Sequence, residues 1–119
     1  MYFMKDEQAH EIKSNLKGGT GDLDFRHIVP PEMLYGAGNF ICVATFEPGQ
    51  SIGLHGHTEN YEIYFILEGE ATVTDNGEER ILYPGDSEIC ANGGTHSICN
   101  KSDKPIKVLG MVLNNFENK

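Results

Sequence analysis

From Phe40 onward the sequence alternates short apolar runs with turn signals, and this rhythm restricts the fold more than any other feature. The runs are rich in β-branched and aromatic residues, which favour strands over helices. The breaks between them contain Pro48-Gly49, Asn76-Gly77 and Pro84-Gly85, which are dipeptides typical of tight turns. The expected strands lie near residues 40–46, 61–67, 71–74, 80–83, 87–90, 96–100 and 106–113. Short strands in such close succession predict an antiparallel sandwich or barrel.

The first 39 residues are less regular. Residues 5–17 are the only stretch compatible with a helix, but its apolar face is thin, so a short arm is the alternative. Gly18-Gly19-Thr20-Gly21 then breaks the pattern, and we interpret these glycines as a loop because no phosphate-binding signature follows. We expect a single domain, with residues 1–39 as an N-terminal arm and lead-in strands and residues 40–119 as the barrel.

Composition narrows the classes of partner. The formal net charge of −9 argues against a nucleic-acid or anionic-membrane surface, which would need clustered lysines and arginines. The chain has no apolar run of the ~18–20 residues that span a bilayer, and its first residues do not resemble a signal peptide. We therefore expect a cytoplasmic protein. Cys42, Cys90 and Cys99 form no C-x-x-C pair, and we expect reduced, buried thiols.

Histidines and a carboxylate form a candidate metal site. His55 and His57 are two residues apart, so on an extended strand they project from the same face. Glu62 lies on the strand that returns after a turn near residues 58–60, and it can reach the same space. Imidazole and carboxylate together suit a divalent transition metal such as Mn, Fe, Ni, Cu or Zn. A further ligand must come from elsewhere, and His96, which enters a strand after a glycine turn, is the best candidate.

These residues carry a resemblance to the cupin superfamily. The spacing Gly49-x5-His55-x-His57-x4-Glu62-x6-Gly69 resembles the first cupin motif. The second motif, G-x5-P-x-G-x2-H-x3-N, has Ala91 in place of its proline and is otherwise matched by Gly85, Gly93, His96 and Asn100. The resemblance implies an all-β, antiparallel jelly-roll barrel and a homodimer. It also implies one metal ion per chain, bound by His55, His57, Glu62 and His96.

Strand parity predicts what surrounds this site. If Glu62 points inward, Tyr64 and Ile66 do so too, and the intervening residues form an apolar outer face that something must cover. Tyr64 could offer its hydroxyl to a substrate, or it could be a core aromatic residue. For the strand at residues 40–46, the sequence does not decide which face is inner. We interpret Arg26 as a solvated arginine, with an anion clamp as the alternative.

Four protein ligands would leave one or two metal positions open for water or a small molecule. The leading hypothesis is a metal-dependent enzyme acting on a small oxygenated metabolite, a sugar or a small carboxylic acid, with Glu62 and Tyr64 as candidate catalytic groups. The resemblance covers isomerases, decarboxylases, lyases and dioxygenases alike, and the fold does not choose among them. The second hypothesis is a non-catalytic module that binds or senses a small molecule such as a sugar.

Overall fold

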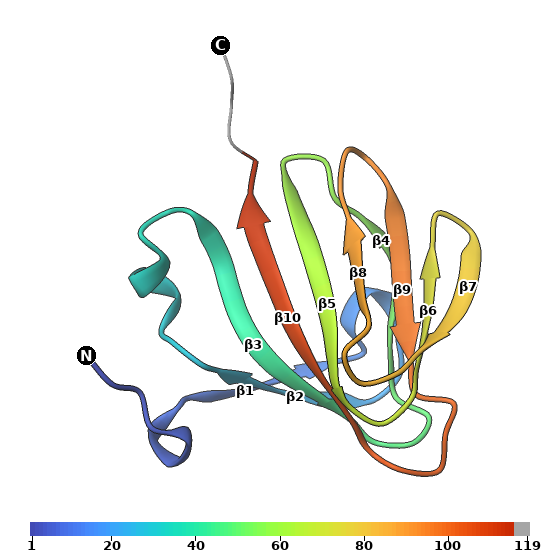
Figure 1. Cartoon of the computed structure of the whole chain (residues 1–119), viewed down its shortest axis with the longest axis horizontal. Coiled ribbons are helices and arrows are strands. Elements are labelled where there is room, and N and C mark those ends of the chain that lie inside the picture. The colour runs from blue at the N-terminus through green and yellow to red at the C-terminus, as the bar shows by residue number, and fades with distance from the viewer. Residues whose placement is uncertain (116–119) are drawn as a thin grey trace.

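Two antiparallel β-sheets enclose the core of the chain in a computed structural model that describes residues 1–115 (Figure 1). The strands are β1 (His10–Ser14), β2 (Asp22–His27), β3 (Gly38–Phe46), β4 (Ser51–Gly56), β5 (Asn60–Glu68), β6 (Ala71–Asp75), β7 (Glu78–Leu82), β8 (Ser87–Cys90), β9 (Thr95–Cys99) and β10 (Ile106–Asn114). The larger sheet has the order β1-β2-β3-β10-β5-β8, and the smaller has the order β4-β9-β6-β7. This is the antiparallel jelly-roll barrel expected from the sequence.

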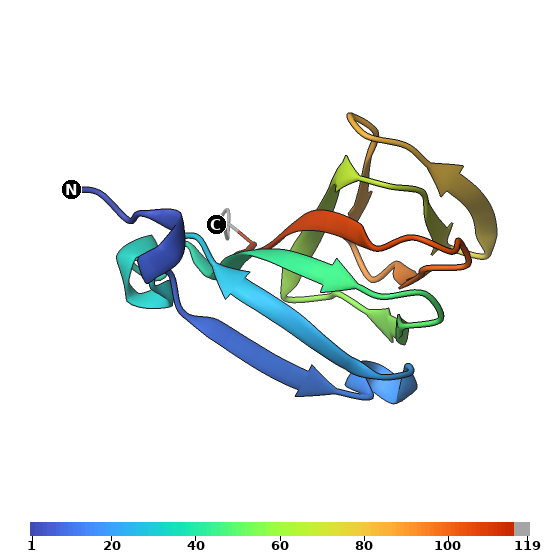
Figure 2. The ribbon, with the colours of Figure 1, turned by 90° about the horizontal axis from the view of Figure 1, so that it is seen from below.

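The N-terminal segment is a strand, so the helix considered for residues 5–17 is wrong. Only a single 3₁₀ turn, η1 (Lys5–Glu7), precedes β1. β1 pairs with β2, and β2 pairs with β3, so the two strands extend one edge of the larger sheet (Figure 2). Backbone pairing with β2 stabilises this segment as a strand. A helix there would bury little apolar surface, because its apolar stripe is thin. Two further 3₁₀ turns follow, η2 (Leu16–Gly18) and η3 (Pro31–Leu34).

The inner faces of the two sheets form the core. On β5 the residues Glu62, Tyr64 and Ile66 are buried, as strand parity predicted. On β3 the buried inner face contains Cys42, Ala44 and Phe46, which settles the orientation that the sequence left open. All three cysteines are free thiols; Cys42 and Cys90 are buried, and Cys99 is half-buried.

Tight turns lie where the sequence placed them. The β6–β7 hairpin turns at Asn76-Gly77, and both residues have positive φ (48° and 85°), as a type I′ turn requires. The turn at Ala91, where the motif proline is missing, is closed by a hydrogen bond of 3.0 Å from Gly94 N–H to the Ala91 carbonyl. Replacement of the proline by alanine therefore leaves the turn intact.

Asn100, the last residue of the second motif, has a structural role. Its side chain is buried and donates hydrogen bonds to the carbonyls of Phe46 (2.9 Å) and Lys104 (2.7 Å). Its Oδ1 accepts from the backbone N–H and the hydroxyl of Ser102. These bonds anchor the connection from β9 to β10 beneath the barrel core.

The outer face of the larger sheet carries apolar side chains that the rest of residues 1–115 leaves exposed. Phe65 is 36% exposed, Leu67 is 41% exposed, and Ile89 on the neighbouring strand β8 is 54% exposed. β1 and β2 continue the edge of the sheet and do not fold over this face (Figure 2). Within residues 1–115 no helix is long and apolar enough to cross a membrane.

Candidate metal centre

The four side chains expected to bind a metal converge inside the barrel. His55 belongs to β4, His57 follows that strand, Glu62 lies on β5, and His96 lies on β9, so both sheets contribute. Glu62 Oε1 lies 3.2 Å from His55 Nε2 and 3.0 Å from the Nε2 atoms of His57 and His96. The Nε2 atoms of His55 and His96 are 3.0 Å apart. The sequence spacing therefore identified side chains that form one cluster.

Backbone contacts hold the ligands in this arrangement. His57 donates its N–H to the Gly94 carbonyl (3.2 Å) and accepts from Gly93 N–H (2.8 Å), so the turn before His96 is bonded to the segment that carries His57. On the neighbouring strand, His55 pairs directly with His96 in the β4–β9 register. A register irregularity in β4 between Ile52 and His55 changes the direction of the strand just before His55.

Each histidine of the cluster has a hydrogen-bond acceptor at Nδ1, on the side away from the centre. The acceptors are the Gly53 carbonyl for His55 (2.8 Å), Asn60 Oδ1 for His57 (2.6 Å), and both Glu88 carboxylate oxygens for His96 (3.0 and 3.1 Å). An acceptor must be met by an N–H, so we assign the proton of each neutral ring to Nδ1. The three Nε2 lone pairs then point at the centre of the cluster, as in histidine metal ligands.

This donor set fits a divalent cation. Three nitrogen lone pairs that lie 3.0–3.2 Å from one carboxylate oxygen repel it unless a positive charge lies between them. Ligand atoms at right angles on an ion with bonds of ~2.1 Å lie roughly 3.0 Å apart, which matches this spacing. Nitrogen ligands with one carboxylate suit several first-row metals and do not select one. The cluster of His55, His57, Glu62 and His96 is thus compatible with a divalent metal.

Without a metal, the cluster keeps a proton between Glu62 and His96. Burial would raise the pKa of Glu62, but hydrogen bonds with His55 and His96 outweigh it and lower the pKa to about 2. Burial would lower the pKa of His96, but hydrogen bonds to Glu62 and Glu88 outweigh it and raise the pKa to about 9. A metal ion must therefore displace a proton from His96 at neutral pH.

Tyr64 packs against the cluster. Its ring stacks on His96 with centroids 4.6 Å apart and an angle of 8° between the planes. Its hydroxyl is buried and has no hydrogen-bond partner among residues 1–115, and burial raises its pKa well above the usual value. Tyr64 does not line the cavity described next. Catalytic roles for Tyr64 and Glu62 therefore stay predictions.

A cavity of about 290 Å³ opens onto the cluster. Its walls combine three of the metal-ligand candidates with apolar side chains and two lysines of the N-terminal segment. It is lined by Lys13, Leu16, Lys17, Phe25, Asn39, Phe40, Ile52, His55, His57, Asn60, Glu62 and Val112. Small molecules reaching the open side of the cluster would enter here.

Arg26 does not line this cavity, so the structure gives no support to the alternative of an anion clamp there. It lies on the opposite face of β2 from Phe25 and hydrogen-bonds to Gln8. The remaining histidines also stay outside the cluster: His10 pairs with Asp24, and His27 lies between Glu11 and Cys42.

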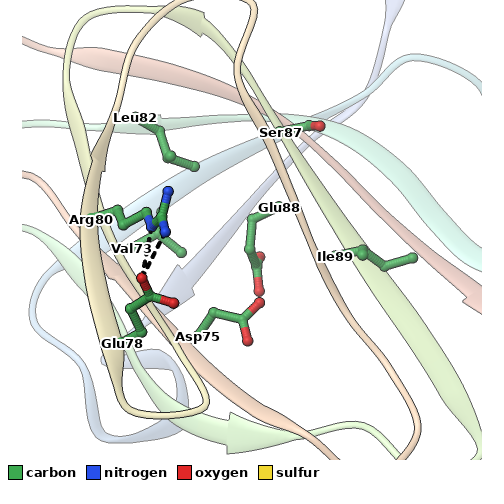
Figure 3. Close-up of a pocket in the computed structure, with 8 residues that line it drawn as sticks. All are labelled: Val73, Asp75, Glu78, Arg80, Leu82, Ser87, Glu88 and Ile89. Carbon is green, nitrogen blue, oxygen red and sulfur yellow. Dashed lines mark hydrogen bonds and ion pairs between the residues drawn. The ribbon is translucent and has the colours of Figure 1, made fainter.

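A second hollow lies on the far side of His96 from the metal ligands, and Figure 3 shows the residues that line it. Glu88 turns toward Asp75, and Glu78 forms an ion pair with Arg80 (2.7 Å). Burial and the neighbouring Asp75 raise the pKa of Glu88, while the hydrogen bond from His96 lowers it. Glu88 and Asn60 support the ligands without having been predicted from the sequence, although the predicted strand at residues 87–90 puts Glu88 and Cys90 on one face.

Comparisons with known proteins agree with this architecture. A family model described as "Cupin domain" matches residues 42–112, more than half of the chain. An oxalate-binding protein from Thermotoga maritima is 31% identical over 113 residues, covering 95% of this chain and 93% of the relative. A solved structure from Thermotoga maritima, described as a predicted oxalate decarboxylase, is similar with a TM-score of 0.90 and 30% identity over 97% of this chain and all of that one. A sugar phosphate isomerase from Silicibacter pomeroyi (TM-score 0.76, 19% identity, 97% of this chain and 76% of that one) is similar in fold.

Replacing Glu88 by Gln should weaken metal binding about tenfold, because the neutral amide makes the His96 ring a less basic ligand. Competition titration with a chromophoric chelator measures the effect. Glu78→Gln is the matched control, since Glu78 lines the same hollow but touches no ligand. Equal affinities for Glu88→Gln and the unsubstituted protein would show that the Glu88 charge has no part in the site.

The stability of the metal-free protein should fall as the pH rises above neutrality. The pKa of His96 is raised from 6.5 to about 9, so its contribution is complete below pH 6.5 and is lost as the pH rises through 9. The pKa of Glu62 is lowered from 4.5 to about 2, so its contribution is present above pH 4.5 and is lost as the pH falls toward 2. Urea unfolding in EDTA should therefore give the highest free energy of unfolding between pH 4.5 and 6.5.

Metal affinity should change in the opposite direction, rising about tenfold per pH unit toward pH 9 as the His96 proton becomes easier to displace. His96→Gln serves as the control, because it removes this proton and should flatten both profiles. A metal-free stability that is constant from pH 6 to 9 would contradict the proton shared by Glu62 and His96.

Proposed function

Because the chain belongs to the cupin superfamily, we propose that His55, His57, Glu62 and His96 bind one divalent transition-metal ion that holds a small carboxylate ligand. The observation that carries the proposal is the convergence of three Nε2 atoms on Glu62 Oε1 at 3.0–3.2 Å, with every Nδ1 already occupied by an acceptor. Once the proton shared by Glu62 and His96 is displaced, such a set offers only lone pairs at its centre, which is what a metal requires.

The ligand class follows from the open side of the cluster. Four protein ligands would leave one or two positions on a five- or six-coordinate ion, and the cavity that His55, His57 and Glu62 line suits only a small molecule. Carboxylate oxygens are good ligands for the same ions. The oxalate-binding relative, 31% identical along nearly the whole chain, supports oxalate as the first ligand to test.

Within this proposal the chain's own residues bind and orient the ligand. Phe25, Phe40 and Val112 form apolar walls that exclude water from the open side of the metal. Apart from the ligand candidates, the ionisable groups among the described lining residues are two lysines, so the cavity has no separate carboxylate or imidazole as general base. We therefore place ligand binding ahead of turnover.

A metal-dependent enzyme is the second candidate. The observation that favours it is the buried hydroxyl of Tyr64, which has no hydrogen-bond partner among residues 1–115 and lies close enough to Glu62 for the Glu62 charge to raise the pKa of Tyr64, in addition to the larger effect of burial. In that case the metal would act as a Lewis acid, and Glu62 and Tyr64 would hold or move a proton.

Titration calorimetry tests the proposal. We expect the purified protein to bind one equivalent of Mn²⁺, Fe²⁺, Ni²⁺, Cu²⁺ or Zn²⁺, and the loaded protein, but not the EDTA-treated one, to bind oxalate. A His57→Ala, Glu62→Ala double variant should bind the ion at least about a hundredfold more weakly. His10→Ala is the control, because His10 is an exposed histidine outside the cluster. Full metal occupancy in the double variant would refute the site, and release of formate from oxalate would favour the enzyme.

We also propose that a second copy of this chain covers the apolar outer face of the larger sheet. Exposed Phe65, Leu67 and Ile89 lie together on β5 and β8, and contiguous apolar surface of this kind marks an interface. Light scattering after gel filtration should report a dimer for the unsubstituted protein and a monomer for a Phe65→Lys, Leu67→Lys variant. Leu54→Lys, an exposed apolar position on the smaller sheet, should remain dimeric. A monomer at every concentration would contradict this interface.

A further inference from the structure

The cavity that opens onto the cluster is lined by two lysines that have no acidic partner among residues 1–115. Lys13 on β1 and Lys17 in η2 both line it, together with His55, His57 and Glu62. Among residues 1–115 neither lysine forms an ion pair, although the chain has 18 acidic and only nine basic residues. Glu11 is close enough to Lys13 for its charge to lower the Glu11 pKa, but Glu11 hydrogen-bonds to His27 instead. In such an acidic protein, a lysine that lines a cavity without an ion-pair partner suggests that the cavity binds an anionic ligand.

Aromatic rings hold the Lys13 ammonium in place. Its Nζ lies 4.6 Å from the ring centroids of both Phe25 and Phe40, two residues that also line the cavity. A cation over two ring faces is attracted by both and loses some of its freedom to move into solvent. The charge is therefore positioned in the wall of the cavity, and it keeps its N–H donors free for a ligand.

The segment that carries these lysines is fixed against the strand of His55. A Cβ atom on Gly53 of β4 would lie 2.1 Å from the Lys17 carbonyl, and one on Gly19 would lie 2.3 Å from the Ser51 carbonyl. Only glycine permits this approach of two backbones. Hydrogen bonds between Thr20 and Ser51 (2.9 and 3.0 Å) complete the contact. The glycine-rich stretch after Leu16 thus docks the N-terminal segment beside the metal ligands.

We propose that Lys13 recognises a second negative charge on the metal-bound ligand, so that the site selects small dicarboxylate dianions over monoanions. This inference rests on the proposed function. A divalent ion with Glu62 leaves one positive charge, which a single carboxylate neutralises. The Lys13 ammonium, in the wall of the same cavity, then matches a second carboxylate by a charge-assisted hydrogen bond.

Calorimetry with two ligands of the same size tests this selectivity. The probes are oxalate and oxamate, in which a neutral carboxamide replaces one carboxylate, titrated into protein loaded with its tightest-binding ion. We expect the unsubstituted protein to prefer oxalate and Lys13→Met to lose about tenfold or more of that preference, since a hydrogen bond to a charged group is lost. Methionine keeps an unbranched apolar stem on Phe25 and Phe40, so the fold should persist.

Two matched variants complete the design. Lys13→Arg keeps the charge and should keep the preference, and Lys5→Met removes the same charge from an exposed position outside the cavity and should change nothing. If Lys13→Met binds oxalate and oxamate in the unsubstituted ratio, Lys13 does not select the ligand, and the proposed function stands. If the loaded, unsubstituted protein binds neither probe, the proposed function itself fails.

Discussion

Three imidazole nitrogens lie 3.0–3.2 Å from a single carboxylate oxygen, a repulsive arrangement that only a cation or a shared proton relieves. The fold holds this arrangement by contacts outside the cluster. Gly53, Asn60 and Glu88 accept the outer N–H groups of the rings, and backbone bonds join His57 to the turn at Gly93-Gly94. These surrounding hydrogen bonds fix the rings and offset the repulsion between the lone pairs when the protein folds. The site is therefore preorganised for an ion.

The two sheets have different tasks around this cluster. The smaller sheet places His55 and His96 directly opposite each other, and the larger sheet brings Glu62 across from β5. The inner faces of both sheets are filled by apolar residues such as Phe46, Ile66 and Ile98, so the polar cluster occupies one end of an otherwise apolar interior. Burial in that setting makes the interactions of Glu62 and His96 strong enough to shift both pKa values far from their ordinary range.

Charge is distributed unequally on the two sides of His96. On one side Glu88 and Asp75 form an acidic hollow that supports the ring through Nδ1. On the other side Lys13 and Lys17 line the cavity that opens onto the ligand cluster. A net charge of −9 describes the surface as a whole, but it conceals a cavity that becomes positive once a divalent ion binds. Composition alone therefore says little about the charge of a ligand in this cavity.

Much of the fold and the four ligand candidates followed from sequence, because a strand has a period of two and its turns have distinctive residues. Glu62, Tyr64 and Ile66 share the buried face as parity required, and the Asn76-Gly77 hairpin forms where its dipeptide placed it. Lead-in strands were expected within residues 1–39, but the position of β1 was not, since β1 is stabilised by pairing with β2 and not by a pattern of its own.

What the sequence by itself determined was which side chains share a face, because local spacing sets that; the return of His96 to His55 and His57 was implied by the resemblance of the second motif to that of cupins. Only the tertiary structure decided that Glu88 supports His96, that Arg26 faces away from the cavity, and that Lys13 enters it. Period two assigns a residue to one of two faces, but it does not say which strand lies beside it. Which strands become neighbours depends on contacts between segments far apart in the chain, such as Gly19 against Ser51. These contacts form only when the barrel closes.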